Sequence, residues 1–265
     1  MLLLTGANGQ LAQAVQKLLP QCIAFSATQL DITDIAAVNS CIKQHKISTI
    51  INCAAYTKVD LAETETEQAW AVNHIGAANL ASTGVRVIHI STDYVFDGSL
   101  QRPYNESDQT NPQTVYGKSK LAGEQAVLAF SQSVVVRTSW LYSASGNNFF
   151  TTMLRLGKQH SQVKVVADQY GSPTNAADLA AVICRLVENT EVVGLYHYAH
   201  KGICSWAEFA QQIMLQAKLH CKVVPITSEQ YPAVAKRPKF SPLESEKICN
   251  ILQIKQHDWF DRLVV

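Results

Sequence analysis

The amino terminus of this chain combines three features in a fixed order. Leu2-Leu3-Leu4 is a short apolar run of the kind that forms a buried parallel strand. A turn containing Gly6 and Gly9 follows, and after it comes a helical pattern of apolar residues. In a dinucleotide-binding unit, the first glycine permits the tight turn and the second lets the backbone approach a pyrophosphate at the positive end of the helix. The segment therefore predicts a dinucleotide site, although an ordinary turn between a strand and a helix could use the same residues.

Apolar runs and helical patterns alternate along the chain. This alternation is typical of a doubly wound parallel sheet with helices on both faces, so we expect an α/β protein of the Rossmann type. We expect a dinucleotide-binding domain at residues 1–142, completed by a strand and a helix near 164–199, and a smaller, mainly substrate-binding lobe at 143–265. The expected strands are residues 2–4, 22–25, 49–53, 85–90, 134–137, 164–167 and 195–199, and the main expected helices are 34–44, 61–81, 115–131, 149–158, 176–188 and 205–218.

Tyr116 and Lys120 are the candidate catalytic pair. They lie four residues apart in a helical pattern, so both side chains share one helix face. A tyrosine has an ordinary pKa of about 10, and a cation held close to the phenol lowers that pKa. We expect Lys120 to act on Tyr116 in this way and prepare it to protonate an alkoxide, or to act as a base in the reverse step. The same spacing occurs by chance in many helices, so the pair needs support from other features.

Thr92 follows the strand predicted at residues 85–90. In an open α/β sheet the ligand crevice lies beyond the carboxyl ends of the strands. The Thr92 hydroxyl would therefore face the start of the helix that carries Tyr116, where it can donate to a substrate carbonyl oxygen. The alternative is that Ser91 and Thr92 only cap a loop.

The composition excludes several classes of protein. A formal net charge of +1 gives no reason to expect a nucleic-acid or membrane partner. No apolar run is long enough for an ordinary transmembrane helix, and the apolar start lacks the length and basic residues of a signal peptide. The seven cysteines form no C-x-x-C pair, so we interpret them as free thiols in a reducing compartment rather than as a metal site. These features predict a cytoplasmic protein.

Several motifs are spread along nearly the whole chain. They lie at residues 5–11, 52–60, 91–96, 116–124, 137–142, 146–149, 168–174 and 237–238. Together they resemble the extended short-chain dehydrogenases/reductases and, more narrowly, the dTDP-4-dehydrorhamnose reductases. The glycine-rich turn and the Tyr–Lys motif are shared by the whole superfamily. The Trp after Arg-Thr-Ser, the Gly-Asn-Asn-Phe motif and the Asp-Gln-Tyr-Gly motif are more specific to the rhamnose reductases.

The resemblance implies an NADPH-dependent reduction of the C4 ketone of dTDP-4-dehydro-β-L-rhamnose, giving dTDP-L-rhamnose. Tyr116 would protonate the carbonyl oxygen and Thr92 would donate a second hydrogen bond to it. The alternatives left open are core packing for Trp140 and for the alanines, and a solvent-exposed charge for Arg237. The residues expected at the cofactor are Gly6, Asn8, Gly9, Gln10, Leu11, Ser26, Asp31, Ile32, Ala54, Ala55, Thr57, Tyr116 and Lys120, and those expected at the substrate are Thr92, Tyr94, Trp140, Asn148 and Arg237.

The cofactor preference is read from the end of the second predicted strand, Ala24-Phe25-Ser26-Ala27-Thr28. Dehydrogenases that prefer NAD usually place an acid there to accept from the ribose 2′-hydroxyl, and this segment has none. Ser26 or Thr28 could donate to the 2′-phosphate of NADP, but no arginine is present to pair with that phosphate. We therefore expect NADPH as the preferred cofactor, with some use of NADH.

Several members of the resembled family dimerise through a magnesium ion held by glutamates. In this chain, residues 11–17 contain no carboxylate, and Glu191 alone remains near a ligand position. A single carboxylate is a poor magnesium site. We therefore expect no metal site and no metal-mediated dimer, and we expect a monomer.

Two other functions stay open. One is a reductase or epimerase that acts on a different nucleotide sugar, and an epimerase would recycle its cofactor rather than consume NADPH. The other is a non-catalytic regulatory subunit resembling the β subunit of methionine adenosyltransferase. Trp140 and residues 146–149 favour the enzyme over the regulatory subunit.

Overall fold

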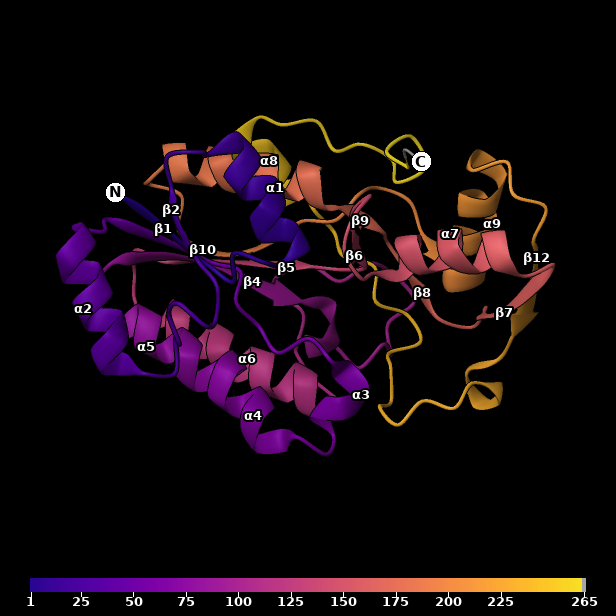
Figure 1. Ribbon diagram of the computed structural model, residues 1–265, viewed down its shortest axis with the longest axis horizontal. Helices are drawn as coiled ribbons and strands as arrows, with labels where there is room; N and C mark the ends of the chain where they lie inside the picture. Colours follow the sequence, from indigo (N-terminus) through magenta and orange to yellow (C-terminus); the bar gives the residue numbers. More distant parts are fainter. Residues whose placement is uncertain (264–265) are drawn as a thin grey trace.

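A six-stranded parallel sheet forms the centre of the larger part of the molecule (Figure 1). The computed structural model describes residues 1–263 of the chain. The strand order is β10-β5-β4-β3-β1-β2, and every neighbouring pair runs parallel, which confirms the expected α/β fold. The strands are β1 (Leu2–Thr5), β2 (Ile23–Phe25), β3 (Thr49–Asn52), β4 (Arg86–Thr92), β5 (Val134–Thr138) and β10 (Gly194–His197).

Helices cover both faces of this sheet because each strand buries side chains on both sides. Leu4 packs in one core with residues of α1, α8 and α10, whereas Leu3 packs in a second core with residues of α2 and α5. Successive side chains of a strand point to opposite faces, so the apolar run of β1 serves both cores. The helices are α1 (Gln10–Leu18), α2 (Ile35–His45), α5 (Ala77–Ser82), α6 (Val115–Leu128), α8 (Ala176–Glu188) and α10 (Glu246–Leu252).

The single long helix expected at residues 61–81 is interrupted. The chain forms α3 (Val59–Ala62), α4 (Thr66–Trp70), a π-helical segment (Ala71–Gly76) and then α5. Asn73 in the π segment is buried, where its amide pairs with the backbone N and O of Tyr56 at 2.9 and 3.1 Å and donates to Ser119 Oγ at 3.0 Å. The wider turn thus joins the loop after β3 to α6, and Ile75 of the same segment is 46% exposed.

The remaining elements form a second lobe with its own core (Figure 1). In that lobe, β7 (Gln162–Val166) pairs in parallel with β12 (Lys222–Ile226). The strand expected at 164–167 therefore belongs to the lobe, whereas α8 and β10 return to the main sheet. Ser205 caps α9 in a capping box with Glu208, and the three-residue spacing of the two is typical of a helix start. The other elements of the lobe are α7 (Phe149–Gln159), α9 (Trp206–Gln216) and the short strands β6 (Leu141–Tyr142), β8 (Tyr170–Gly171), β9 (Thr174–Asn175) and β11 (Cys204–Ser205).

Candidate active site

A cavity of about 840 Å³ lies at the carboxyl ends of β1, β3, β4 and β5. This is the edge of an open α/β sheet where ligands bind. The cavity is lined by every residue that the sequence assigned to the cofactor, and also by Thr92, Tyr94 and Trp140 from the expected substrate set. The structure thus brings together residues from opposite ends of the first half of the chain, while Asn148 and Arg237 lie outside this lining.

The glycine-rich turn provides a backbone surface at one end of the cavity. Gly6 has φ +72°, a conformation that favours glycine, and a Cβ there would lie 2.7 Å from the backbone N of Ala54. Gly9 is the N-cap of α1 and its N–H donates to Gly6 O at 2.9 Å. No side chain caps the first turn of α1, so its N–H groups meet the cavity as a site for an anion. The turn therefore fits a dinucleotide pyrophosphate.

The helix α6 presents the candidate catalytic pair to the same cavity. Thr114 caps α6, and its hydroxyl accepts from Gly117 N at 3.0 Å. Tyr116 and Lys120 both line the cavity, as their four-residue spacing predicted, whereas Lys118 between them is exposed.

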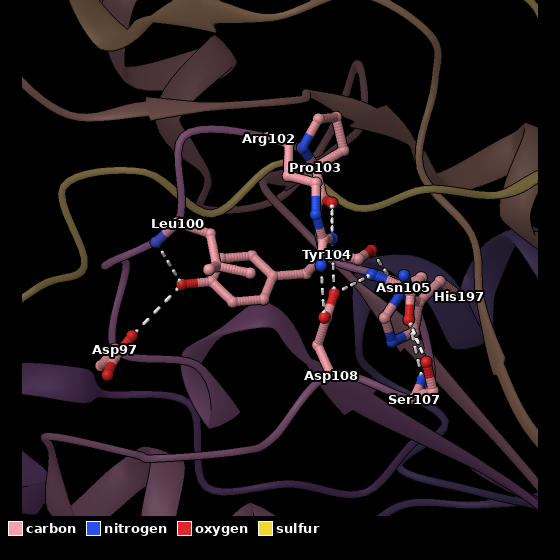
Figure 2. Close-up of polar contacts among 9 residues, drawn as sticks. All are labelled: Asp97, Leu100, Arg102, Pro103, Tyr104, Asn105, Ser107, Asp108 and His197. Carbon is pink, nitrogen blue, oxygen red and sulfur yellow. Dashed lines mark hydrogen bonds and ion pairs between the residues drawn. The ribbon is translucent and has the colours of Figure 1, made fainter.

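The loop between the 3-10 turn Asp93–Val95 and α6 is held by its own polar contacts (Figure 2). Tyr104 donates its phenol proton to Asp97 at 3.2 Å, and Arg102 pairs with Asp108 at 2.6 Å. His197 of the edge strand β10 donates from Nδ1 to Tyr104 O at 3.0 Å. These contacts tie the loop to β10, the edge strand of the sheet.

Tyr116 faces the cavity with a pKa raised to about 12, because burial of the phenol outweighs a hydrogen bond with the Thr92 side chain, and Asp93 raises the pKa further. The prediction that Lys120 lowers this pKa is therefore wrong in this structure. The ammonium group of Lys120 instead donates to Ile90 O at 2.6 Å, and the side chains that act on the pKa of Tyr116 are those of Thr92 and Asp93. Burial dominates because it penalises the phenolate directly.

Lys120 is almost fully buried, with 2% of its surface exposed. Burial lowers its pKa to about 8, and the nearby Glu124 carboxylate opposes this shift. Glu124 is itself held by Arg137 at 2.7 Å and by the hydroxyl of Ser91. Lys120 is therefore a lysine whose charge changes close to neutral pH.

Two stacked tryptophans form the far wall of the cavity. Trp140 and Trp206 stack with ring centroids 3.4 Å apart and an interplanar angle of 6°. Trp140 has φ +46°, which is rare for a bulky residue, and Gly171 leaves room for its ring because a Cβ there would lie 2.4 Å away. Trp140 is partly buried and packs against the core of the second lobe, and it also lines the cavity. Sequence reasoning missed Trp206, which follows the recognisable cap Ser205 but meets Trp140 only through the fold.

Arg237 lies beside a second cavity of about 680 Å³, which Lys236 and Lys239 also line. It is not the exposed charge left open by the sequence, because its side chain is 21% exposed and pairs with Asp60 at 2.5 Å. Its positive charge acts on Tyr94, which lines the first cavity, so Arg237 lies between the two.

Asn148 serves as the N-cap of α7. Its Oδ1 accepts from Thr151 N at 3.0 Å, and its Nδ2 donates to Gln10 Oε1 at 3.0 Å. The amide is thus used within the protein, and its neighbour Asn147 lines the cavity instead. Asn148 connects the glycine-rich segment to the second lobe.

The end of β2 places a hydroxyl where the ribose-binding acid of NAD enzymes would lie. Ser26 lines the cavity, and its Oγ contacts Gln29 Oε1 and Thr28 Oγ1, both at 2.9 Å. Thr28 is exposed and lies outside the lining. Asp31 lines the cavity, although its Oδ1 accepts from the backbone and hydroxyl of Thr33 at 2.9 and 2.8 Å.

Within residues 1–263, no group of three or more His, Cys, Asp or Glu side chains is placed to hold a metal ion. Glu191 lies on the surface near Arg86. In the same part of the chain, no helix combines the length and apolarity that crossing a membrane requires.

Comparisons with known proteins agree with this geometry. The model of the RmlD substrate binding domain family matches residues 1–264. A dTDP-4-dehydrorhamnose reductase of Aggregatibacter actinomycetemcomitans is 42% identical, over 97% of this chain and 95% of the relative. A crystal structure of such a reductase from Clostridium acetobutylicum is 43% identical, with a TM-score of 0.94 over 99% of this chain and 96% of that one. Another from Bacillus anthracis, in complex with NADP, is 41% identical, with a TM-score of 0.94 over 98% and 95%. The chain belongs to the dTDP-4-dehydrorhamnose reductase family.

Proposed function

We propose that this protein reduces the C4 ketone of dTDP-4-dehydro-β-L-rhamnose to dTDP-L-rhamnose and that NADPH is its hydride donor. The observation that carries the proposal is one cavity lined by the Gly6–Gly9 turn, Tyr116, Thr92 and Lys120. The names of the relatives support it, and so does the NADP in the Bacillus anthracis structure. The product belongs to nucleotide-sugar biosynthesis.

The side chains of the cavity act on the carbonyl oxygen. Bound NADPH supplies a hydride to the carbonyl carbon, and negative charge then builds on the oxygen. Tyr116 donates its phenol proton to that oxygen, and Thr92 donates a second hydrogen bond. A pKa raised to about 12 keeps the phenol protonated at neutral pH, which suits an acid in the direction of reduction. Lys120 lines the same cavity and positions the nicotinamide ribose.

The substrate lies between the catalytic pair and the second lobe. Trp140 gives the sugar ring an apolar wall with one N–H donor, and Tyr94 lies beside it. Arg237 binds the diphosphate, and the neighbouring Lys236 adds positive charge. Asn148 contributes indirectly, by holding the start of α7 against the glycine-rich segment.

The cofactor preference follows from Ser26 at the end of β2. Ser26 can donate to the 2′-phosphate of NADPH, and no acid lines the cavity at that position to repel it. Asp31 and Ile32 lie beside the adenine. Because no arginine meets the 2′-phosphate in this segment, NADH serves as a weaker donor.

The test supplies dTDP-4-dehydro-L-rhamnose, generated in situ, and follows loss of NADPH absorbance at several concentrations of the ketosugar. Saturating oxidation that requires the ketosugar supports the proposal. An epimerase would interconvert its sugars without net consumption of NADPH. Stable capture of a methionine adenosyltransferase catalytic chain, with no oxidation of NADPH, would favour the regulatory subunit.

The protein acts as a monomer in the cytoplasm, without a metal-mediated dimer interface. Light scattering with and without a chelator tests this point, and a dimer that the chelator dissociates would contradict it.

A further inference from the structure

A buried chain of hydrogen bonds leads from β1 to the catalytic lysine, and the reaction above does not use it. Thr5 Oγ1 donates to Asn52 Oδ1 at 2.7 Å, and Asn52 Nδ2 lies 2.9 Å from His89 Nδ1. His89 Nε2 in turn lies 3.3 Å from Lys120 Nζ. Thr5, Asn52 and His89 are each 1% exposed, so water cannot supply a partner where two donors or two acceptors of this hydrogen-bond series face each other.

The backbone fixes the orientation of the Asn52 amide. Ala54 N–H lies 3.1 Å from Asn52 Oδ1, and a backbone N–H can only donate. The atom facing Ala54 must therefore be the amide oxygen, and the atom facing His89 must be the NH₂ group. His89 Nδ1 consequently accepts a hydrogen bond and carries no proton.

His89 is a neutral imidazole in this environment. Burial holds its pKa well below 6.5, and the positive charge of Lys120 lowers that pKa further. A neutral imidazole carries one proton, and since Nδ1 accepts from Asn52, the proton is on Nε2. The Nε2–H group is thus directed at Lys120 Nζ.

Lys120 meets this N–H in two different ways according to its charge. An ammonium group has only donors, so it would face His89 Nε2–H as one donor against another. A neutral amine has a lone pair that accepts from His89 while still donating to Ile90 O at 2.6 Å. Every partner in the chain from Thr5 to Lys120 is satisfied only when the amine is neutral.

We propose that His89 is a positioning residue whose Nε2–H disfavours the ammonium form of Lys120 and so sets the pH at which the lysine loses its proton. The burial of Lys120 acts in the same direction. Glu124 on α6 and Cys53 after β3 act in the opposite direction, and Tyr116 shares the cavity. Any effect of this protonation on the reaction rests on the proposed function. The protonation states of His89 and Lys120 themselves do not.

The first test observes the tautomer of His89 in the unaltered protein. Long-range proton–nitrogen NMR of protein labelled with ¹⁵N-histidine distinguishes a proton on Nε2 from one on Nδ1 and from an imidazolium. The His89 signals are assigned by their loss in His89→Phe. We expect a neutral ring protonated on Nε2 throughout the range from about pH 6 to 9, around the ordinary histidine pKa and above it. A proton on Nδ1, or an imidazolium at neutral pH, would overturn the proposal.

The second test follows the lysine itself. NMR titration of ¹³C-lysine-labelled protein, assigned by loss of the signal in Lys120→Met, gives the pKa of Lys120. His89→Phe removes the opposing donor, so we expect this pKa to rise by roughly one unit. Asn52→Asp replaces the NH₂ donor by an acceptor, moves the imidazole proton to Nδ1 and should also raise it. The exposed His160, changed to Phe, is the matched control and should leave the pKa unchanged.

Thermal unfolding shows whether His89→Phe and Asn52→Asp fold. Either variant alone is enough for the test if the other fails to fold. An unchanged Lys120 pKa in whichever of the two variants folds would overturn the role of His89. Both NMR measurements need no substrate or cofactor. A protein that shows the expected tautomer and shift, but does not oxidise NADPH with the ketosugar, would refute the proposed function alone.

Discussion

The buried ion pair between Glu124 and Arg137 supports α6, the helix that carries Tyr116 and Lys120. Arg137 Nη2 lies 2.7 Å from Glu124 Oε2, and Arg137 Nε donates to both carboxylate oxygens at 2.9 and 3.1 Å. The side chains of Arg137 and Glu124 are 4% and 1% exposed. Glu124→Gln keeps the shape of the side chain but removes its charge. The guanidinium group would then lie beside neutral partners alone, namely the amide oxygen of the new glutamine, the Phe96 ring at 5.1 Å and the neutral His197.

The expected cost follows from this burial. Removing one partner of a buried ion pair costs about 3–5 kcal/mol, because the other charge remains without water or a counter-ion. Arg185 and Glu188 form the matched control, since they are also an Arg–Glu pair but are 52% and 61% exposed. For such an exposed pair, Glu188→Gln should cost less than about 1 kcal/mol. Comparing Glu→Gln at the two sites therefore shows how much of the lost stability comes from burial of the ion pair.

Urea unfolding, followed by circular dichroism, measures both variants. The midpoint for Glu124→Gln should fall well below that of the unaltered protein with the same slope, whereas Glu188→Gln should nearly match it. Adding Arg137→Met to Glu124→Gln should recover most of the lost stability, because no unpaired charge remains. A cost of Glu124→Gln below about 1 kcal/mol would refute the argument, since the guanidinium would then have found another way to be solvated.

Three further predictions concern the chemistry and the acid limit of stability. Tyr116→Phe should lower kcat by roughly 10²–10⁴-fold while NADPH affinity, measured by fluorescence, stays nearly unchanged; a near-full rate would exclude Tyr116 as the acid. Ser26→Asp should weaken NADPH relative to NADH by about 10-fold or more in kcat/KM, because the carboxylate repels the 2′-phosphate. Burial lowers the pKa of His197 to about 3, so its stabilising contribution is present above its ordinary pKa and is lost as pH falls towards 3. His197→Gln should therefore lose stability less steeply over that window in acid titrations of unfolding, and an unchanged slope would contradict this.

The sequence by itself determined the architecture and which residues line the main cavity. The apolar run of β1, the glycines after it and the four-residue spacing of Tyr116 and Lys120 are local patterns, and each imposes a backbone period or turn wherever it occurs. Because parallel strands bring their carboxyl ends to one edge, those local patterns were enough to place the expected cofactor residues around one cavity.

Other features depended on the tertiary structure. The pKa of Tyr116 is raised and not lowered, because its burial exceeds the effect of its helix neighbour. Trp206 stacks on Trp140 although the two lie far apart in the sequence, and Asn148 is used as a helix cap rather than facing the cavity. The π turn around Asn73 lets its side chain hydrogen-bond to Tyr56 and Ser119, which are distant in the sequence.

Both kinds of result have one physical reason. The spacing of apolar residues and the residues of a turn act between neighbours in the sequence, so both can be recognised from the sequence alone. Desolvation, stacking and the choice of hydrogen-bond partner depend on which distant residues are packed together, as with Lys120 and the chain that reaches it from Thr5. The sequence names the groups that carry the chemistry, and only the fold decides their charge.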